Sequence, residues 1–189
     1  MGKNALIIVD VLKDFVDGSL PVPDAIDIVP GIETAMESGD YDYIVCVIET
    51  HSEDHCSFIE NGGKYPRHCV EEGSEPVYDL SCLDDASKVV VWMKGKNPLI
   101  DSPSAFYDDE GHSTGLRQQL DSLDVTEVKV CGLALEICVK LTAIDAAVAG
   151  FNTTVLANLC KALDYSNEAI AKCYIELTDN GVTVDTTTG

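Results

Sequence analysis

Short runs of apolar residues recur along the chain, and most are continuous rather than alternating with polar residues. Six such runs predict β-strands at residues 5–9, 43–48, 88–93, 127–131, 153–156 and 182–184. Continuous apolar strands are typical of a sheet that is covered on both faces. The segments between them predict helices at 29–37, 113–123, 135–149 and 166–178. This alternation predicts an α/β fold with a parallel sheet.

Glycine, proline and the lengths of the irregular segments refine this pattern. Pro30 lies near the start of the first predicted helix, and Gly150 ends the third. There is no internal repeat and no linker rich in Ser, Gly or Pro, so we expect a single domain of residues 1–189. Two long irregular segments, 49–86 and 95–111, separate the predicted elements. Loops of this length in a compact domain are often functional.

Composition excludes several classes of function. The 189 residues include 12 Lys and Arg against 33 Asp and Glu, with a formal net charge of −21 and 46% hydrophobic residues. Such a surface repels phosphate backbones and anionic membranes, so we expect neither nucleic acid nor membrane as a partner. The first apolar run, which ends at Asp10, is too short for a signal peptide, and we expect a cytoplasmic protein. The eight cysteines form no CxxC pair and are expected to be mostly free thiols.

Charged residues follow three of the predicted strands. Asp10 follows the first strand, Glu49 and His51 follow the second, and Lys94 follows the third. In open α/β sheets, ligands bind beyond the carboxyl ends of the strands, so these side chains are expected to converge. Any one of them could simply mark a strand that reaches the surface, but three together favour a site. A lysine at such a position either reaches water or lowers the pKa of a neighbouring group.

Cys138 differs from the other cysteines in its position. The chain turns through Gly132 after the fourth strand, and Cys138 falls in the first turns of the helix that follows. Free backbone N–H groups at a helix start favour a thiolate and can hold an oxyanion. No histidine is close to Cys138 in sequence, so Asp10 is the available base. The alternative interpretation is a buried structural cysteine.

A cluster of histidines indicates a metal site. Three of the four histidines lie close together in sequence, namely His51, His55 and His68. With Glu49 they offer nitrogen and oxygen ligands suited to Zn²⁺, Fe²⁺ or Mn²⁺. Cys56 and Cys69 adjoin two of them, so a Cys/His zinc site and a solvated loop without metal are the alternatives. His112, in an acidic run, is expected to be solvated.

Together these motifs resemble the isochorismatase-like cysteine hydrolases and, within that family, the nicotinamidases. The resemblance covers nearly the whole chain, and its motifs lie at residues 10 and 14–15, 49–51, 65–70, 94–95 with 104–106, and 132–139. The last motif, which contains Cys138, is the most specific. The resemblance implies a three-layer α/β/α fold with a six-stranded parallel sheet.

The resemblance also implies a mechanism. Asp10, Lys94 and Cys138 would form the catalytic triad, and a cis peptide between Leu133 and Ala134 would accompany an oxyanion hole made by the N–H groups of Ala134 and Cys138. The implied activity is hydrolysis of nicotinamide to nicotinate and ammonia through a cysteine thioester, a step in NAD salvage.

The implied cofactor is one divalent metal ion, with zinc expected first and iron or manganese as alternatives. Glu49, His51 and His68 would hold it, and His55 occupies the position of an additional ligand in some members. The metal acid is usually Asp in the family, so the longer Glu49 must fold back or coordinate from a different angle. The implied substrate contacts are Phe15, Tyr65 and Leu133.

Other functions stay open on the sequence. An amidase acting on pyrazinamide, an N-carbamoyl compound or a ureido acid would keep Asp10, Lys94 and Cys138 without needing the metal. A non-catalytic metal-binding thiol sensor would use Cys138 as a reversibly oxidised thiol, but it has no need of the other two residues. By resemblance alone, a homo-oligomer is expected.

Overall fold

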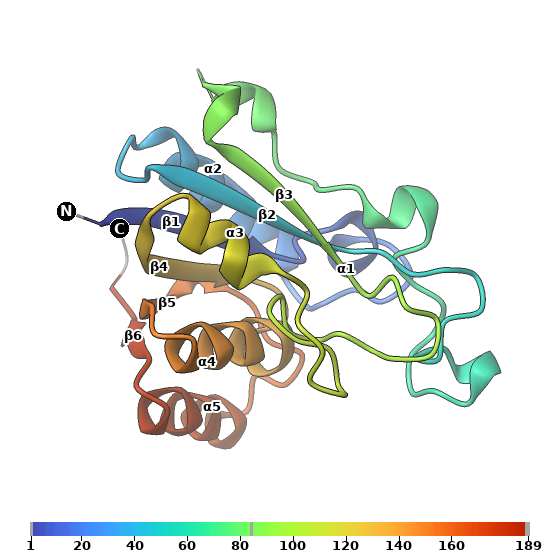
Figure 1. Cartoon of the computed structure of the whole chain (residues 1–189). Helices are drawn as coiled ribbons and strands as arrows, with labels where there is room; N and C mark the ends of the chain where they lie inside the picture. Colours follow the sequence, from blue (N-terminus) through green and yellow to red (C-terminus); the bar gives the residue numbers. More distant parts are fainter. Residues whose placement is uncertain (1, 84, 188–189) are drawn as a thin grey trace.

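The computed structural model describes residues 2–83 and 85–187, and its centre is a sheet of six parallel strands (Figure 1). The strands lie in the order β3-β2-β1-β4-β5-β6. Their bounds are Lys3–Val9 (β1), Tyr43–Glu49 (β2), Val89–Lys94 (β3), Val125–Gly132 (β4), Asn152–Cys160 (β5) and Thr183–Asp185 (β6). All six predicted strands are present, and the predicted parallel sheet is confirmed.

Helices cover both faces of this sheet, which gives the three predicted layers. The connection from β1 to β2 runs in one direction across the sheet. The connections from β3 to β4, from β4 to β5 and from β5 to β6 run in the other direction. Because crossovers between parallel strands are right-handed, the two sets of helices lie on opposite faces. One face carries α2 (Val29–Glu37), and the other carries α3 (Leu116–Ser122), α4 (Lys140–Val148) and α5 (Asn167–Asp179) (Figure 1).

Strand β1 marks the point where the strand order reverses. Residues Ala5 to Val9 are fully buried, because β1 lies between β2 and β4 under both layers. Val9 pairs with Val47 of β2 on one side and with Gly132 of β4 on the other. Ligands of open α/β sheets bind at this reversal, beyond the carboxyl ends of the strands. Segment 95–111 lies at that end of the sheet, and segment 49–86 begins there before it returns to the start of β3 (Figure 1).

The segment predicted as one helix at 135–149 has two parts. It begins with the π-helical turn η6 (Leu135–Val139), and only then continues as α4. The carbonyl of Ala134 accepts hydrogen bonds from both the Ile137 and the Val139 N–H groups, at 3.0 and 3.2 Å. The second of these bonds spans five residues, which widens the turn relative to an α-helix.

The shortest helical elements were not predicted. They are α1 (Lys13–Val16) and the 3₁₀ turns η1 (Ala25–Ile28), η2 (Ile59–Asn61), η3 (Glu71–Ser74), η4 (Leu80–Cys82) and η5 (Ala86–Lys88). Helical turns of three or four residues are too short to show a helical period in the sequence. Helix α3 begins later than predicted because Gly115, with a left-handed φ of 93°, precedes its first residue.

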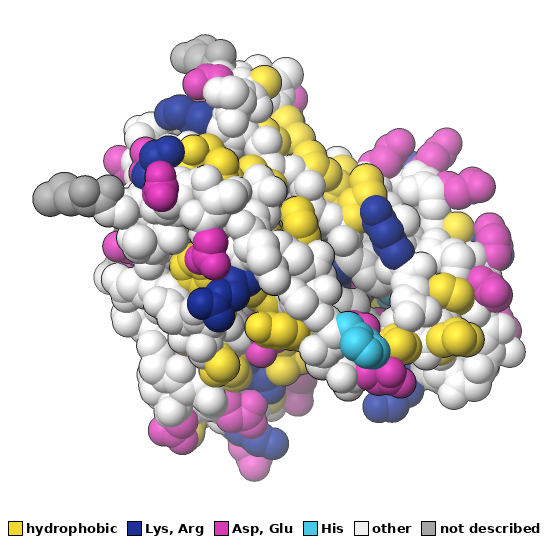
Figure 2. Space-filling model, in the orientation of Figure 1, with side chains coloured by type: hydrophobic (Ala, Val, Ile, Leu, Met, Phe, Trp, Pro, Cys, Tyr) yellow, Lys and Arg dark blue, Asp and Glu magenta, His cyan; other side chains and the backbone are white. Residues whose placement is uncertain are grey.

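The surface and the cysteines agree with the composition. Figure 2 shows many acidic side chains spread over the visible face, with fewer basic ones between them. All eight cysteines are free, as predicted. Among the described residues, no helix is long and apolar enough to cross a membrane.

Candidate active site

Three charged side chains meet at the carboxyl end of the sheet. Asp10 directly follows β1, while Glu49 and Lys94 are the last residues of β2 and β3 and pair in register. Their exposed fractions are 1%, 4% and 2%, so all three are withdrawn from water. Cys138 comes to the same place from η6, after β4. The structure thus brings together residues that lie far apart in sequence.

Lys94 is the centre of this group. Its Nζ lies 2.9 Å from Asp10 Oδ2 and 2.7 Å from Glu49 Oε1. The same nitrogen donates toward Cys138 Sγ at 3.9 Å. A buried ammonium ion needs anionic partners to compensate for its lost hydration. The two carboxylates therefore fix Lys94 and hold its charge beside the thiol.

Burial and charge together set the protonation of the group. Burial raises the pKa of Asp10 to about 6, although Lys94 opposes the shift. Burial alone would lower the pKa of Lys94, but Asp10, Cys138 and Glu49 raise it well above its ordinary value. For Glu49, Lys94 and the histidines outweigh burial and hold its pKa well below the usual range. Lys94 therefore stays a cation, and Asp10 is a carboxylate able to accept a proton near neutral pH.

Burial and the helix start act on the Cys138 thiol in opposite directions. The helix start was expected to favour a thiolate at Cys138, but burial raises the pKa of this thiol well above its usual value, and Lys94 offsets only part of the effect. This direction agrees with the role expected for Asp10, which is to take the proton from the Cys138 thiol. Asp10 faces Cys138, with its carboxylate oxygen within 4.8 Å of the sulfur. A neutral thiol beside a carboxylate of raised pKa is an arrangement for proton transfer at the moment of reaction.

The backbone between β4 and Cys138 is held close to β1. The Leu133–Ala134 peptide bond is cis, in agreement with the resemblance. Gly132 has a φ of 118°, and a Cβ atom there would lie 2.1 Å from the Val9 carbonyl oxygen, so glycine is required. Ala134 directly precedes η6, and Cys138 is the fourth of the five residues of that turn. Their role as an oxyanion hole stays a prediction.

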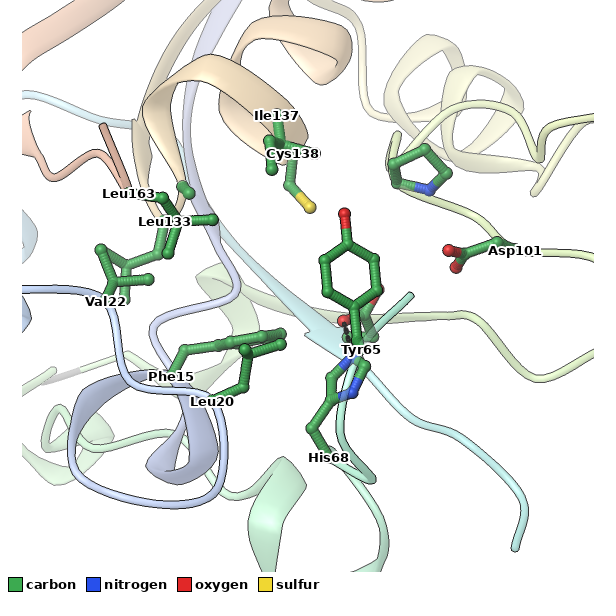
Figure 3. A pocket seen from close by; sticks show the side chains of 13 residues that line it. Phe15, Leu20, Val22, Tyr65, His68, Asp101, Leu133, Ile137, Cys138 and Leu163 are labelled. Atoms are coloured by element: carbon green, nitrogen blue, oxygen red, sulfur yellow. Dashed lines mark ion pairs between the residues drawn. The ribbon is translucent and has the colours of Figure 1, made fainter. Parts of the chain in front are cut away.

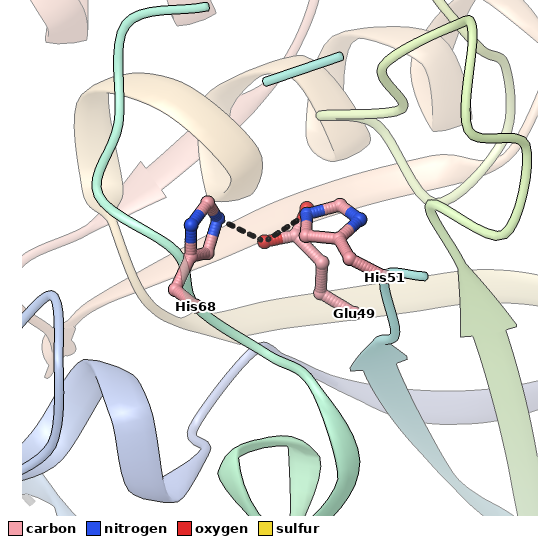
Figure 4. A group of neighbouring side chains, drawn as sticks. All are labelled: Glu49, His51 and His68. Atoms are coloured by element: carbon pink, nitrogen blue, oxygen red, sulfur yellow. Dashed lines mark ion pairs between the residues drawn. The ribbon is translucent and has the colours of Figure 1, made fainter. Parts of the chain in front are cut away.

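Glu49, His51 and His68 form one group of possible metal ligands (Figure 4). Glu49 Oε2 lies 3.6 Å from His51 Nε2 and 3.5 Å from His68 Nε2. The Nδ1 of His51 lies 2.9 Å from the Gly95 carbonyl, and that of His68 lies 2.7 Å from the Pro66 carbonyl. A carbonyl only accepts hydrogen bonds, so each Nδ1 is the donor and each Nε2 keeps a lone pair that faces the group.

This donor set fits a divalent metal ion. Ligands about 2.1 Å from one tetrahedral ion lie about 3.4 Å from one another, close to the separations between Glu49 Oε2 and the two Nε2 atoms. The His51 Nε2 is buried and has no hydrogen-bond partner among the described residues, as a ligand atom would. Glu49 uses its other oxygen for Lys94. The longer carboxylate thus connects the ligand group directly to Lys94.

His55 is placed next to this group rather than within it. Its ring stacks on that of His51, with 3.7 Å between ring centres and 20° between planes. Its Nδ1 accepts the Ser57 N–H at 3.3 Å, which leaves the proton on Nε2. As a possible metal ligand, His55 groups with His51 and Asp101 and not with Glu49 or His68. In this arrangement His55 supports His51 by stacking.

A cavity opens over Cys138 and the metal-ligand group (Figure 3). The three predicted substrate contacts all line it, namely Phe15, Tyr65 and Leu133. The Phe15 and Tyr65 rings approach the His68 ring with centres 5.5 and 5.8 Å away. Glu49, His68, Ala134 and Cys138 line the same cavity, so the thiol and the ligand group face one space.

Sequence reasoning missed part of the cavity wall. The additional lining residues are Leu20, Val22, Asp101, Pro103, Ile137 and Leu163. Asp101 and Pro103 fall in the irregular segment 95–111, whose length was the only signal for a functional role. Ile137 lies in η6, while Leu20, Val22 and Leu163 lie in irregular segments where no periodic pattern marks them.

The sequence has clear relatives. Residues 4–188 match the Isochorismatase domain family. The chain is 34% identical to a nicotinamidase of Acinetobacter baylyi, over 94% of this chain and 90% of the relative.

Two solved structures show the same fold at similar identity. PnC1 from L. infantum, in complex with nicotinate, has a TM-score of 0.88 and 35% identity, covering 97% of this chain and 92% of its own. A pyrazinamidase of Pyrococcus horikoshii, in complex with zinc, has a TM-score of 0.85 and 33% identity, covering 98% of this chain and 99% of its own. The likeness therefore extends over nearly the whole length of both relatives.

Proposed function

The chain belongs to the isochorismatase domain family, and from this we propose that it is a nicotinamidase, which hydrolyses nicotinamide to nicotinate and ammonia as a step in NAD salvage. One observation carries the proposal. The partly buried Cys138 thiol, with Lys94 at 3.9 Å and Asp10 beside it, opens into the same cavity as Glu49 and His68. Relatives along nearly the full length are nicotinamidases, and one relative was solved with nicotinate.

The substrate ring occupies the cavity between Phe15 and Tyr65. Both side chains line the cavity, and aromatic rings stack favourably on a flat heteroaromatic ring. Leu133 contacts the ring from the side of the nucleophile. This placement directs the carboxamide toward Cys138, so that the reacting carbon and sulfur are held together before reaction.

Acylation begins with proton transfer. Asp10 takes the proton from Cys138, and the sulfur attacks the carboxamide carbon to give a tetrahedral oxyanion. The N–H groups of Ala134 and Cys138 hold that oxygen. The Lys94 ammonium ion stabilises the negative charge as it passes from Asp10 to the sulfur. Asp10 then donates its proton to the leaving nitrogen. The C–N bond breaks, ammonia leaves, and a thioester on Cys138 remains.

Deacylation reuses the same carboxylate. Asp10 accepts a proton from a water molecule whose oxygen attacks the thioester carbon. The C–S bond breaks, nicotinate leaves, and the proton returns to the Cys138 sulfur. Lys94 keeps its charge through both half-reactions because Glu49, which takes no part in the proton transfers, pairs with it throughout.

One divalent ion would be held by Glu49, His51 and His68. Zinc is the metal we expect first, because the P. horikoshii relative was solved in complex with zinc. When bound, the ion supplies a Lewis-acid contact for the ring nitrogen of the substrate. The residues of this chain otherwise orient the substrate ring. His68, itself a ligand, packs against Phe15 and Tyr65 and so connects the ligand group to the walls that hold the ring.

Three further parts of the proposal concern the whole protein. We propose one domain for residues 1–189, supported by the single six-stranded sheet to which both halves of the chain contribute strands. We propose a cytoplasmic enzyme, supported by the eight free cysteines, which suit a reducing compartment. Assembly into a homo-oligomer is proposed on the resemblance alone.

Ammonia release from nicotinamide by the purified protein tests the proposal. Wild-type protein loaded with zinc should release ammonia, and release should be lost in the Cys138→Ala variant and in a chelated sample. No release from the zinc-loaded wild type would contradict the nicotinamidase assignment. Release that persists after chelation would instead support an amidase that does not need the metal.

A further inference from the structure

The peptide group of Cys69 joins both histidine ligands. Cys69 directly follows His68, and its backbone carbonyl accepts a hydrogen bond from the backbone N–H of His51 at 2.9 Å. The same carbonyl accepts the Ser74 hydroxyl at 2.7 Å, and the Cys69 N–H donates to Asp14 Oδ2 at 2.7 Å. Cys69 has a left-handed φ of 51°, which is uncommon for a residue with a side chain and needs support from its surroundings. Asp14 is the charged partner at this junction.

Asp14 also belongs to the wall of the cavity. It lies in α1 immediately before Phe15, whose ring packs against His68. Its second oxygen, Oδ1, accepts the Ser19 N–H at 3.2 Å, and its carbonyl accepts the Leu20 N–H at 3.0 Å. Phe15 and Leu20 both line the cavity. One residue therefore contacts the loop of the metal ligands and the segment that forms the apolar wall.

The chain leaves room for this carboxylate on both sides. A Cβ atom at Gly73 would lie 2.0 Å from Asp14 Oδ2, and one at Gly18 would lie 2.3 Å from Asp14 Oδ1. At Gly73 the three nearest atoms all belong to the Asp14 carboxylate. Gly73 has no positive φ, so its backbone would accept alanine and only the carboxylate would collide with it. Gly73 thus offers a way to displace Asp14 without removing it.

We infer that Asp14 is a positioning residue, which fastens the loop of His68 and Cys69 to helix α1 and so sets the affinity for the metal ion and the closeness of Phe15 to His68. The metal part of the inference stands on the ligand group alone. The part that concerns substrate affinity rests on the proposed function. Asp14 touches none of the proposed reacting atoms and acts through the backbone of Cys69 and through its own helix.

The expected effect follows from the hydrogen bonds. In Asp14→Asn, the amide nitrogen replaces one of two oxygens that each accept an N–H, so one of those bonds is lost and two donors face each other. Loss of a group that orients metal ligands typically weakens metal binding 10- to 100-fold. We expect the zinc dissociation constant to rise about tenfold. KM for nicotinamide should rise as well, while kcat at saturating zinc and substrate changes little, because Asp10, Lys94 and Cys138 are untouched.

The test measures zinc affinity of the full-length chain by competition with a chromophoric chelator. Asp14→Asn and Gly73→Ala should both weaken zinc binding, and Gly73→Ala should add little in an Asp14→Ala background, where no carboxylate is left to displace. Asp17→Asn, an exposed carboxylate after the same helix, is the matched control and should bind zinc like wild type. Melting of the metal-free proteins shows that each variant is folded.

Each outcome decides the inference. If Asp14→Asn and Gly73→Ala lower the melting temperature but leave zinc affinity unchanged, Asp14 is only structural and the inference fails. If Gly73→Ala weakens zinc binding equally with and without the Asp14 carboxylate, the collision is not its cause and the inference also fails. Wild-type protein that binds zinc but releases no ammonia from nicotinamide would refute the proposed function and leave the zinc result standing.

Discussion

Glu49 and Lys94 end neighbouring strands in register, and their side chains form a buried ion pair of 2.7 Å. The other oxygen of Glu49 faces His51 and His68, and the same lysine nitrogen reaches Asp10. A single carboxylate therefore connects the metal-ligand group to the proposed catalytic residues. The ligand group and the nucleophile belong to one charged network rather than to two separate sites.

Glu49→Gln tests this connection. The substitution keeps the size of the side chain but removes the charge that both Lys94 and a metal ion would use. We expect weaker zinc binding and, at zinc concentrations that saturate the variant, kcat still reduced at least tenfold. Full recovery of kcat once zinc is saturating would show that Glu49 serves the metal alone.

Replacement of Lys94 should cost both stability and activity. In Lys94→Met, the carboxylates of Asp10 and Glu49 stay buried without their shared cation. Removing one partner of a buried ion pair typically costs about 3–5 kcal/mol in free energy of unfolding. Denaturant unfolding of the metal-free protein measures the cost, and Lys96→Met, at an exposed position two residues away, is the control. Equal stability of the two variants would argue against a charged Lys94 at the centre of the group.

The rate should depend on pH through Asp10. Burial raises the pKa of this carboxyl to about 6, and only its ionised form can take the Cys138 proton. As pH falls through about 6 the base becomes protonated, so kcat/KM should fall tenfold per pH unit below that value. A pH profile of kcat/KM, recorded in parallel with zinc content, checks this. An acid limb that begins near pH 4 would contradict a raised pKa at Asp10.

Metal content and activity should separate between two variants. His51→Ala removes a proposed ligand whose Nε2 is buried and faces the group, and it should lose zinc before it loses its fold. Asp10→Asn removes the proposed base and should lose activity with little change in zinc content. Elemental analysis together with the ammonia assay distinguishes them. The reverse order, with zinc lost from Asp10→Asn and retained in His51→Ala, would overturn both roles.

The fold and the centre of the site could be predicted because they depend on local pattern. Continuous apolar runs located all six strands, and the polar residues after them converge because parallel strands end at one edge. The fate of each charge could not be predicted in the same way. The helix start alone favours a thiolate at Cys138, but burial by segments distant in sequence raises the pKa of this thiol well above its usual value.

The cavity wall and its supports depend on tertiary contacts that leave no mark in the sequence. Leu163 and Val22 reach the cavity from loops without periodicity. The bond from the Cys69 N–H to Asp14 joins residues 55 positions apart. His55 was a candidate ligand by its spacing, but only the bond to Ser57 and the stacking on His51 reveal its orientation.

The most direct test of the account is to identify the acylated residue. Wild-type protein is mixed with excess nicotinamide, quenched in acid during turnover, digested and examined by mass spectrometry, with Cys138→Ser carried through the same steps. The account predicts a nicotinoyl group on the peptide that contains Cys138 and none on the peptides of the other seven cysteines. A nicotinoyl group on another residue, or ammonia release at the wild-type rate by Cys138→Ser, would contradict it.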